Sequence, residues 1–354
     1  MTLSKPHRAN RSRLWALLMV LPICGCAQNL ASAAFPSSGD KFSNPLLTSG
    51  PDPWVVSHQG VYYYTHTMRD RIALWRTSDI TDLANAEQKV VWTPPAEGPN
   101  AHLIWAPELH RMDGKWFIYY SATASGFKDD EHRAVFVLEN ASPDPLVGEW
   151  IDRGRVNTRY AGIDGTIFQH RGETYFAYSP YIGAVSGIAI AKMANPWTLK
   201  GEEAVIALPD KPWEDQGGRR ILEGPEFLAG PSGRVFMTYS AGACWSDNYS
   251  LGLLEARADA DLLSRDSWTK HPNPVLSSAN GVYATGHNGF FRSPDGKEQW
   301  IIYHANPAAD MGCTLKRAPH VGRVTWTPSG EPRFPAPSSP STSLAKPSGT
   351  SAKR

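Results

Sequence analysis

The sequence predicts an all-β fold, and within that class a five-bladed β-propeller. Its 354 residues include 30 Gly, 29 Pro, 13 Trp and 13 Tyr, and few long runs have the apolar spacing of a helix. Five aromatic-rich segments share one pattern, and their repeated tyrosines are Tyr64, Tyr120, Tyr178, Tyr239 and Tyr303. A glycine turn precedes each segment, which is typical of a β-hairpin. Repeats of 56 to 64 residues are too small to bury their own faces, so five of them predict five blades around one axis.

Residues 1–33 predict a secretory signal peptide. Four basic residues precede an apolar run, 14–24, which is too short to span a bilayer. Cleavage before Cys26 would leave that cysteine for lipidation, as in a bacterial lipoprotein, whereas the Ala-Ser-Ala sequence at 31–33 would be an ordinary cleavage site. We therefore expect an exported protein, either an outer-membrane or periplasmic lipoprotein or a secreted one.

The propeller itself is assigned to residues 35–334, and the first strand of each blade carries the residues of interest. These strands begin at Asp52, Ala106, Asp164, Glu223 and His287. The first strand of a blade lies nearest the axis, so we expect these positions to converge on the central channel. An Asp before Pro or Gly is, taken alone, more often a turn residue. Three carboxylates at one repeat position favour catalysis instead, because neighbouring carboxylates repel and resist burial.

Convergent carboxylates supply what glycosidic bond cleavage requires. One carboxyl must be protonated to assist the leaving oxygen, and another must be ionised to activate water or attack the sugar. A third acid nearby can hold the first proton by raising the pKa of its neighbour.

Residues 335–354 predict a disordered tail. They include one large apolar residue, Leu344, and cannot bury enough surface to offset the entropy of ordering them. The chain has 35 Lys and Arg against 34 Asp and Glu, and loss of the four basic signal residues would leave 31 against 34. Without a basic cluster we expect no nucleic-acid partner, and membrane contact only through the lipid anchor.

Two cysteines lie outside the signal region, Cys244 and Cys313. In an exported protein such a pair is typical of a disulfide bond, although two buried free thiols also fit the sequence. Neither cysteine lies in a C-x-x-C pattern of the kind that binds zinc.

Five short motifs, taken in order, carry a resemblance to a known family. They are Asp52-Pro53-Trp54, Trp105-Ala106-Pro107-Glu108, Asp164-Gly165-Thr166, Glu223-Gly224-Pro225 and Gly286-His287-Asn288. Through their order and their placement at blade starts, the chain resembles glycoside hydrolase family 43 over nearly all of residues 44–334. Stretches such as AHLIWAPELH and YSAGACWSDNYSLGLLEA are similar to the exo-acting α-L-arabinofuranosidases of that family.

The resemblance implies a role for each acid. Asp52 matches the general base, Glu223 the general acid, and Asp164 the residue that orients the acid and raises its pKa. The family inverts the anomeric configuration, so base and acid are expected roughly 6.5–9.5 Å apart, with room for a water molecule. The resemblance also implies a disulfide bond between Cys244 and Cys313.

Other residues are candidates for binding. His287 matches an axial histidine that in the family helps to hold a calcium or other ion, often through waters, although a hydrogen-bonded core histidine also fits. Trp54 and Trp105 flank channel positions and could stack on a furanose ring or pack the blades together. Arg323, in the last blade, could reach a sugar hydroxyl. We expect no required cofactor, with a calcium ion in the central channel as a candidate, and a monomer that acts on a plant polysaccharide or oligosaccharide.

The resemblance thus implies an inverting enzyme that removes α-L-arabinofuranosyl residues from arabinan or arabinoxylan-type chains. A β-xylosidase or an endo-arabinanase on the same scaffold is the alternative, and the loops that close the pocket would decide between them. A non-catalytic sugar-binding lipoprotein is a further alternative, against which the intact Asp52, Asp164 and Glu223 argue. A sucrose- or fructan-acting enzyme is disfavoured because its Arg-Asp-Pro and Glu-Cys motifs are absent.

Overall fold

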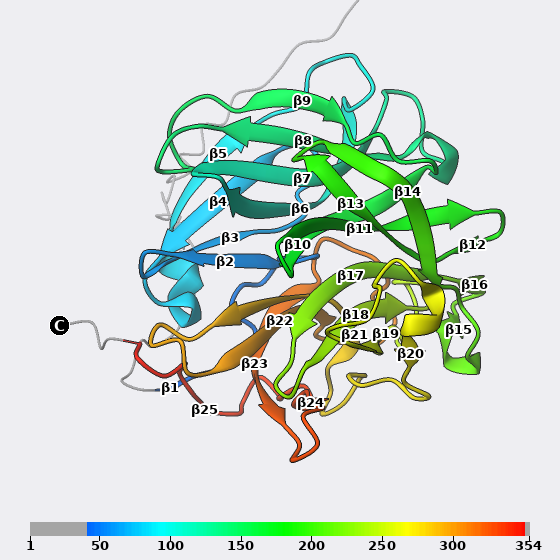
Figure 1. Ribbon diagram of the computed structural model, residues 1–354. Helices are drawn as coiled ribbons and strands as arrows, with labels where there is room; N and C mark the ends of the chain where they lie inside the picture. Colours follow the sequence, from blue (N-terminus) through cyan, green and yellow to red (C-terminus); the bar gives the residue numbers. More distant parts are fainter. Residues whose placement is uncertain (1–40, 351–354) are drawn as a thin grey trace, which may run out of the picture. The chain divides into compact units, whose positions relative to one another are not determined.

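The computed structural model describes residues 41–350, which form five antiparallel sheets around one axis (Figure 1). In each sheet the four main strands are neighbours in the order of the chain. This arrangement confirms the predicted five-bladed β-propeller. The predicted signal peptide, 1–33, and its Cys26 lie outside the described residues.

The first blade contains β2 (Trp54–His58), β3 (Val61–Thr65), β4 (Ile72–Thr77) and β5 (Glu87–Trp92). The second contains β6 (His102–Met112), β7 (Lys115–Thr123), β8 (Ala134–Asn140) and β9 (Ile151–Arg155). The third contains β10 (Gly162–His170), β11 (Glu173–Ile182), β13 (Ile188–Asn195) and β14 (Thr198–Ala207), and the short β12 (Val185–Ser186) pairs with β11. The fourth contains β17 (Leu222–Ala229), β18 (Arg234–Ala241), β19 (Ser250–Arg257) and β20 (Thr269–Lys270). The fifth contains β21 (Tyr283–Arg292), β22 (Gln299–Asn306), β23 (Ala318–Trp326) and β24 (Pro332–Arg333).

Short elements complete the fold. They are β1 (Lys41–Phe42), β25 (Leu344–Ala345), the hairpin of β15 (Asp215–Gln216) and β16 (Arg219–Arg220), and the 3₁₀ helices η1 (Ile80–Asn85), η2 (Asp130–His132), η3 (Pro212–Glu214) and η4 (Arg265–Ser267). Within residues 41–350, no helix has the length and apolar character needed to cross a membrane.

The five repeat tyrosines explain why the blades recur. Each lies on the second strand of its blade and is at most 1% exposed. Tyr239, for example, pairs with Gly252 of β19. A Cβ atom at Gly252 would lie 2.2 Å from the tyrosine ring, so glycine provides the room for that ring. The predicted hairpins between first and second strands are all present.

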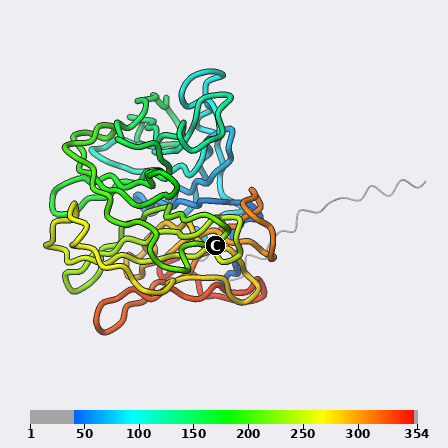
Figure 2. Tube along the Cα trace, turned by 90° about the vertical axis from the view of Figure 1, so that its right-hand side faces the viewer, coloured from blue at the N-terminus to red at the C-terminus, as the bar shows by residue number. Residues whose placement is uncertain are grey.

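The ring closes where the first and fifth blades meet. Figures 1 and 2 show the blue first blade beside the orange last blade, and β2 packs against β21. Asn44 bonds both backbone groups of Val321: its Nδ2 donates to the carbonyl at 2.9 Å, and its Oδ1 accepts from the N–H at 2.9 Å. The N–H of Gly50 donates to the carbonyl of Arg317 at 2.8 Å. Within residues 41–350 no blade lends a strand to another, so these bonds fasten the seam.

The C-terminal segment departs from the sequence prediction. We predicted disorder for 335–354, but residues 335–350 are ordered against the propeller. β25 pairs with β1, Lys346 Nζ lies 2.8 Å from Asp79 Oδ2, and Ser348 N–H donates to Glu298 Oε2 at 2.9 Å. The prediction was wrong because polar bonds to the folded blades hold this segment, and its own composition does not reveal them.

Candidate active site

One pocket at the channel gathers most of the predicted site residues. The cavity measures about 310 Å³, and its walls include Asp52, Asp164, Glu223, His287 and Trp105. Each of the five comes from the first strand of a blade or from the loop just before it. The structure therefore brings the three predicted acids together, as the repeat suggested.

The inner end of each blade holds one residue with left-handed backbone. These residues are Asp52, Ala106, Asp164, Gly224 and His287, with φ between 40° and 57°. In four blades the N–H of this residue donates to a side chain of the neighbouring blade. Asp52 donates to His304, Ala106 to Thr67, Asp164 to Ser121 and His287 to Ser240. This bond locks the inner end of one blade to the next.

Glu223 departs from this pattern and corrects part of the sequence prediction. The left-handed position of the fourth blade is Gly224, so Glu223 lies one residue before the repeat position of Asp52 and Asp164. The N–H of Gly224 donates to Asp164 Oδ2 at 3.0 Å. The hydroxyl of Ser179, the side chain of the third blade that corresponds to Ser121 and Ser240, therefore does not receive the N–H of Gly224 and has no hydrogen-bond partner in the described protein. Glu223 instead shares its strand register with Trp105 and Ile163, which also line the pocket.

Asp52 is held in the ionised form. Its Oδ2 accepts from Thr67 Oγ1 at 2.7 Å, and its Oδ1 lies 3.1 Å from Arg317 Nη1 and 3.5 Å from His287 Nδ1. Burial opposes ionisation, but Arg317, His287 and His304 together hold the pKa of Asp52 well below its usual value. An ionised carboxylate in a sugar-sized pocket can accept a proton from water.

The pKa values of Asp164 and Glu223 are raised, in contrast to that of Asp52. Burial is the main cause that raises the pKa of Asp164 to about 7, and the charges of Glu223 and Asp52 add to it. Burial also raises the pKa of Glu223, although Tyr249 donates to its Oε1 at 2.7 Å and opposes the shift. Each raised pKa favours the protonated form of its carboxyl. A protonated carboxyl at this place can act as a general acid.

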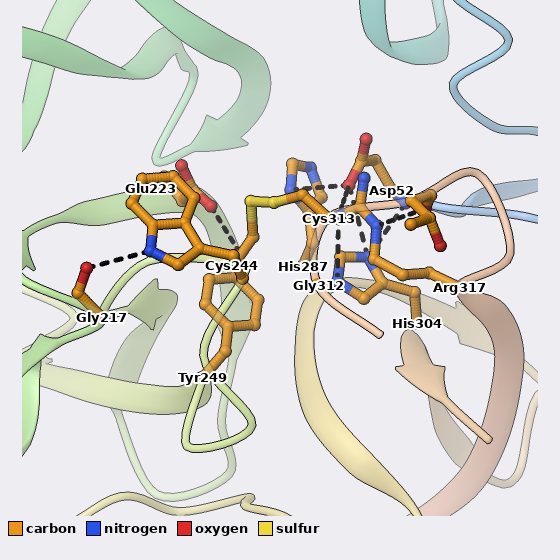
Figure 3. Close-up of a disulfide and its surroundings, with 12 residues drawn as sticks. Asp52, Gly217, Glu223, Cys244, Tyr249, His287, His304, Gly312, Cys313 and Arg317 are labelled. Atoms are coloured by element: carbon orange, nitrogen blue, oxygen red, sulfur yellow. Dashed lines mark hydrogen bonds and ion pairs between the residues drawn. A yellow bond between two sulfur atoms is a disulfide. The ribbon is translucent and has the colours of Figure 1, made fainter. Parts of the chain in front are cut away.

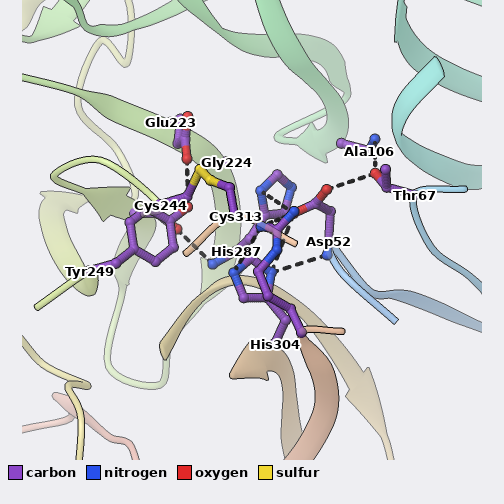
Figure 4. Close-up of polar contacts among 12 residues, drawn as sticks. Asp52, Thr67, Ala106, Glu223, Gly224, Cys244, Tyr249, His287, His304 and Cys313 are labelled. Carbon is purple, nitrogen blue, oxygen red and sulfur yellow. Dashed lines mark hydrogen bonds and ion pairs between the residues drawn. A yellow bond between two sulfur atoms is a disulfide. The ribbon is translucent and has the colours of Figure 1, made fainter. Parts of the chain in front are cut away.

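His287 lies between the carboxylates. Figure 4 shows Glu223 and Asp52 on opposite sides of its ring, and His287 Nδ1 lies 3.9 Å from Asp164 Oδ2. Burial lowers the pKa of His287, but the three acids more than offset this, so its pKa is raised. Within residues 41–350 no group of three or more His, Cys, Asp or Glu side chains is arranged to hold a metal ion.

The predicted sugar-binding residues divide into two groups. Trp105 lines the pocket, and the buried guanidinium of Arg133 lies over its ring at 3.4 Å. Trp54 packs between blades instead: its Nε1 donates to the carbonyl of Leu109 at 2.8 Å. Arg323 is 58% exposed, pairs with Glu298 at 3.0 Å and lies in a different cavity, so the structure corrects its prediction.

Two functional partners escaped the sequence analysis, Arg317 and Tyr249. Arg317 pairs with Asp52 across 265 positions of the chain, and Tyr249 bonds Glu223 from the loop after β18. Neither lies on a repeated strand, so no periodicity marks them. The disulfide bond between Cys244 and Cys313 is present and ties together the loops that carry these two residues (Figure 3).

Comparisons with known proteins agree with this geometry. The family model described as glycosyl hydrolases family 43 matches residues 42–332. The chain is 38% identical over 322 residues to an extracellular exo-α-(1→5)-L-arabinofuranosidase of Streptomyces avermitilis, covering 87% of this chain and 66% of that protein. It is 37% identical over 274 residues to a protein of the same name from Streptomyces chartreusis, covering 75% of this chain and 82% of that protein. The chain thus spans just under two thirds of the length of the Streptomyces avermitilis relative.

A solved structure gives the same picture. The crystal structure of an α-L-arabinofuranosidase from Lactobacillus brevis superposes with a TM-score of 0.80 and 34% identity, covering 85% of this chain and 98% of that one. A thermostable family-43 glycoside hydrolase superposes with a TM-score of 0.72 and 25% identity, covering 87% of this chain and 100% of that one.

Proposed function

The chain belongs to the glycosyl hydrolases family 43, and on that basis we propose that it is an inverting glycosidase that releases α-L-arabinofuranosyl residues from arabinan or arabinoxylan-type chains. The observation that carries the proposal is that acids in one pocket have pKa values shifted in opposite directions. Asp52 has a lowered pKa, whereas Asp164 and Glu223 have raised ones. The names of the Streptomyces relatives supply the sugar.

In the proposed reaction Asp52 takes a proton from a water molecule, and the water oxygen attacks the anomeric carbon. Glu223 gives its proton to the glycosidic oxygen as the carbon–oxygen bond breaks. The leaving chain departs as a neutral alcohol, and the sugar is released with inverted configuration. Tyr249 supports Glu223 by its hydrogen bond, and Arg317 keeps Asp52 ionised.

Asp164 acts as a positioning residue in this proposal. Its Oδ2 accepts from the N–H of Gly224, the residue that follows Glu223, so it fixes the backbone that carries the acid. Its charge also favours a protonated Glu223, because two buried carboxylates resist joint ionisation.

The test is hydrolysis of a paired aryl α-L-arabinofuranoside and aryl β-D-xyloside by the wild type, Asp52→Ala and Glu223→Gln. We expect arabinoside activity that Asp52→Ala abolishes. Glu223→Gln should lose most activity on poor leaving groups, since these need protonation most. Preference for the xyloside would keep the mechanism and change the substrate. Inactivity on both, and on arabinan and xylan oligomers, would favour the sugar-binding alternative.

Attack from the chain end is a further part of the proposal. Asp130 of η2 and Arg219 of β16 pair at 2.8 Å, and both line the pocket. This bridge joins a loop of the second blade to a hairpin before the fourth, and we infer that it narrows the opening of the pocket. A narrow mouth suits a chain end better than an internal segment. Linear arabinan should therefore yield free arabinose from the outset, whereas early oligosaccharide products would support an endo-acting enzyme.

We also propose that the protein is exported and works as a monomer. Both Streptomyces relatives are named as extracellular, and residues 1–33 have the composition of a signal peptide. Labelling with a palmitate analogue tests lipidation at Cys26: label that Cys26→Ala removes would support a lipoprotein. An unlabelled wild type would favour cleavage near Ala33.

A further inference from the structure

Trp245 is an exposed tryptophan at the mouth of the active-site pocket. It is 46% exposed, and every other tryptophan within residues 41–350 is less exposed. It belongs to none of the hydrophobic core clusters of the described chain, yet it lines the same pocket as Glu223. Core packing therefore does not account for this side chain.

The structure holds this indole in place although it is exposed. Trp245 Nε1 donates to the carbonyl of Gly217 at 2.9 Å, a bond drawn in Figure 3. Gly217 has φ 71°, and a Cβ atom there would lie 2.9 Å from the indole nitrogen, so glycine permits the approach. The preceding residue, Cys244, is fastened to Cys313 by the disulfide bond. A fixed, exposed aromatic face loses little freedom when a ligand binds.

The position of this loop beside Glu223 indicates which part of the substrate Trp245 would contact. The loop that carries Trp245 also carries Tyr249, whose hydroxyl donates to Glu223. In Figures 3 and 4, Cys244 lies on the Glu223 side of the site, and Asp52 lies on the other side of His287. A general acid protonates the glycosidic oxygen that departs with the leaving group. The leaving sugar therefore passes the Glu223 side of the pocket.

We propose that Trp245 is the platform for the pentose unit on the leaving-group side of the scissile bond. The C–H face of a furanose or pyranose ring packs on the indole, as apolar sugar faces do on aromatic rings. Arg219, whose Nη2 bonds Asp130 at the same rim, is placed to receive the hydroxyl groups of this unit. The inference rests on the proposed glycosidase function and adds a subsite to it.

The test compares two substrates that differ only beyond the scissile bond. α-1,5-Linked arabinotriose fills the subsite, whereas methyl α-L-arabinofuranoside leaves it empty. Trp245→Ala should lower kcat/KM for arabinotriose by about tenfold while changing that for the methyl glycoside by less than about twofold. Trp245→Phe keeps an aromatic face and should recover most of the loss. Phe127→Ala is the matched control, because Phe127 is 40% exposed but does not line the pocket.

The outcomes separate this inference from the function on which it rests. Equal losses on both substrates would show that Trp245 only maintains the loop, and no loss on either would show that no sugar stacks there. Each result overturns the subsite while leaving the glycosidase intact. A wild type inactive on both substrates would overturn the proposed function, and the subsite with it.

Discussion

Asp52 and Asp164 are the same residue type beside the same imidazole, and their pKa values move in opposite directions. His287 Nδ1 lies 3.5 Å from Asp52 and 3.9 Å from Asp164, so His287 does not distinguish them. Arg317 does, because its guanidinium contacts Asp52. Asp164 has Glu223 as a neighbouring charge instead. In the proposed mechanism, Arg317 therefore makes Asp52 rather than Asp164 the base.

The pH dependence of kcat/KM should report both groups. Asp52 must be ionised, and its lowered pKa means that activity persists until the pH falls below about 3.8, the ordinary aspartate value. The acid must be protonated: burial raises the pKa of Glu223, and Asp164 beside it loses its own proton only as pH rises through about 7. We expect a bell-shaped profile, measured on an aryl arabinofuranoside. A flat profile up to pH 9 would contradict the raised pKa.

Arg317→Met should move the acidic limb of that profile. Without the guanidinium, burial of Asp52 is less well offset, so the pKa of the base rises and activity fails at a higher pH. We expect a shift of about one pH unit or more. Arg317→Lys retains the charge and should shift the limb less. An acidic limb that stays in place in Arg317→Met would show that Arg317 does not set the ionisation of Asp52.

Asp164→Asn should stabilise the protein while impairing catalysis. A carboxyl with a raised folded pKa favours the folded state most below its unfolded value, and this contribution is lost as pH rises from about 3.8 to about 7. The amide carries no such penalty, so the variant should gain on the order of 4 kcal/mol at pH 8 and little at pH 4. Thermal unfolding at both pH values measures this, and an equal effect at both would contradict it.

The site could be predicted from the sequence only as far as the repeat extends. Asp52, Asp164 and His287 occupy one repeat position, so aligning the hairpins finds them. The same alignment found Glu223 but assigned it to the repeat position that Gly224 occupies. The sequence Glu-Gly-Pro does not reveal which residue has the left-handed backbone conformation. Arg317 was missed because it lies on a loop between the second and third strands of its blade, outside the repeated hairpin.

At the scale of elements, loops outside the repeat complete the site. The loop after β18 carries Tyr249, and the loop between β22 and β23 carries Arg317. The disulfide bond joins these loops across 69 positions of the chain. The strands thus position the acids, while the tied loops provide the groups that adjust them.

The double variant Cys244→Ser/Cys313→Ser should be less stable and less active. Loss of a cross-link of this length relaxes the unfolded chain and costs about 4 kcal/mol in the chain-entropy view. The freed loops should also lower kcat, because Tyr249 and Arg317 are less well placed. Chemical unfolding and kinetics of the variant, beside reduced wild type, measure both effects. Unchanged kcat would show that the loops keep their positions without the bond.

The hairpins and the tail show which elements composition can predict. The glycine turns and buried tyrosines act locally, and all five hairpins appear where they were expected. The order of residues 335–350 depends on Asp79 and Glu298, which lie far away in sequence. Local patterns predict local pairing, and distant polar partners leave no such pattern.

At the scale of the whole molecule, the seam between the first and fifth blades determines whether the ring stays closed. Asn44→Ala removes three hydrogen bonds, two to the backbone of Val321 and one to Ser338 Oγ, and leaves the N–H and carbonyl of Val321 without their partner. We expect a loss of about 3 kcal/mol and a melting temperature lower by about 5 °C. Asn85→Ala, at an exposed position of η1, is a suitable control. Equal melting temperatures for both variants would show that other contacts fasten the seam.

The same seam has a consequence for how the protein is made. Asp52 belongs to the first blade, whereas His287, His304 and Arg317 come from the fifth, more than 230 residues later in synthesis. A nascent chain with four blades folded already contains Asp52, Asp164 and Glu223, but the groups that keep Asp52 ionised do not yet exist. If Asp52 is the base as proposed, catalytic competence arises with the last blade, and fragments truncated before it carry the three acids without the groups that keep Asp52 ionised.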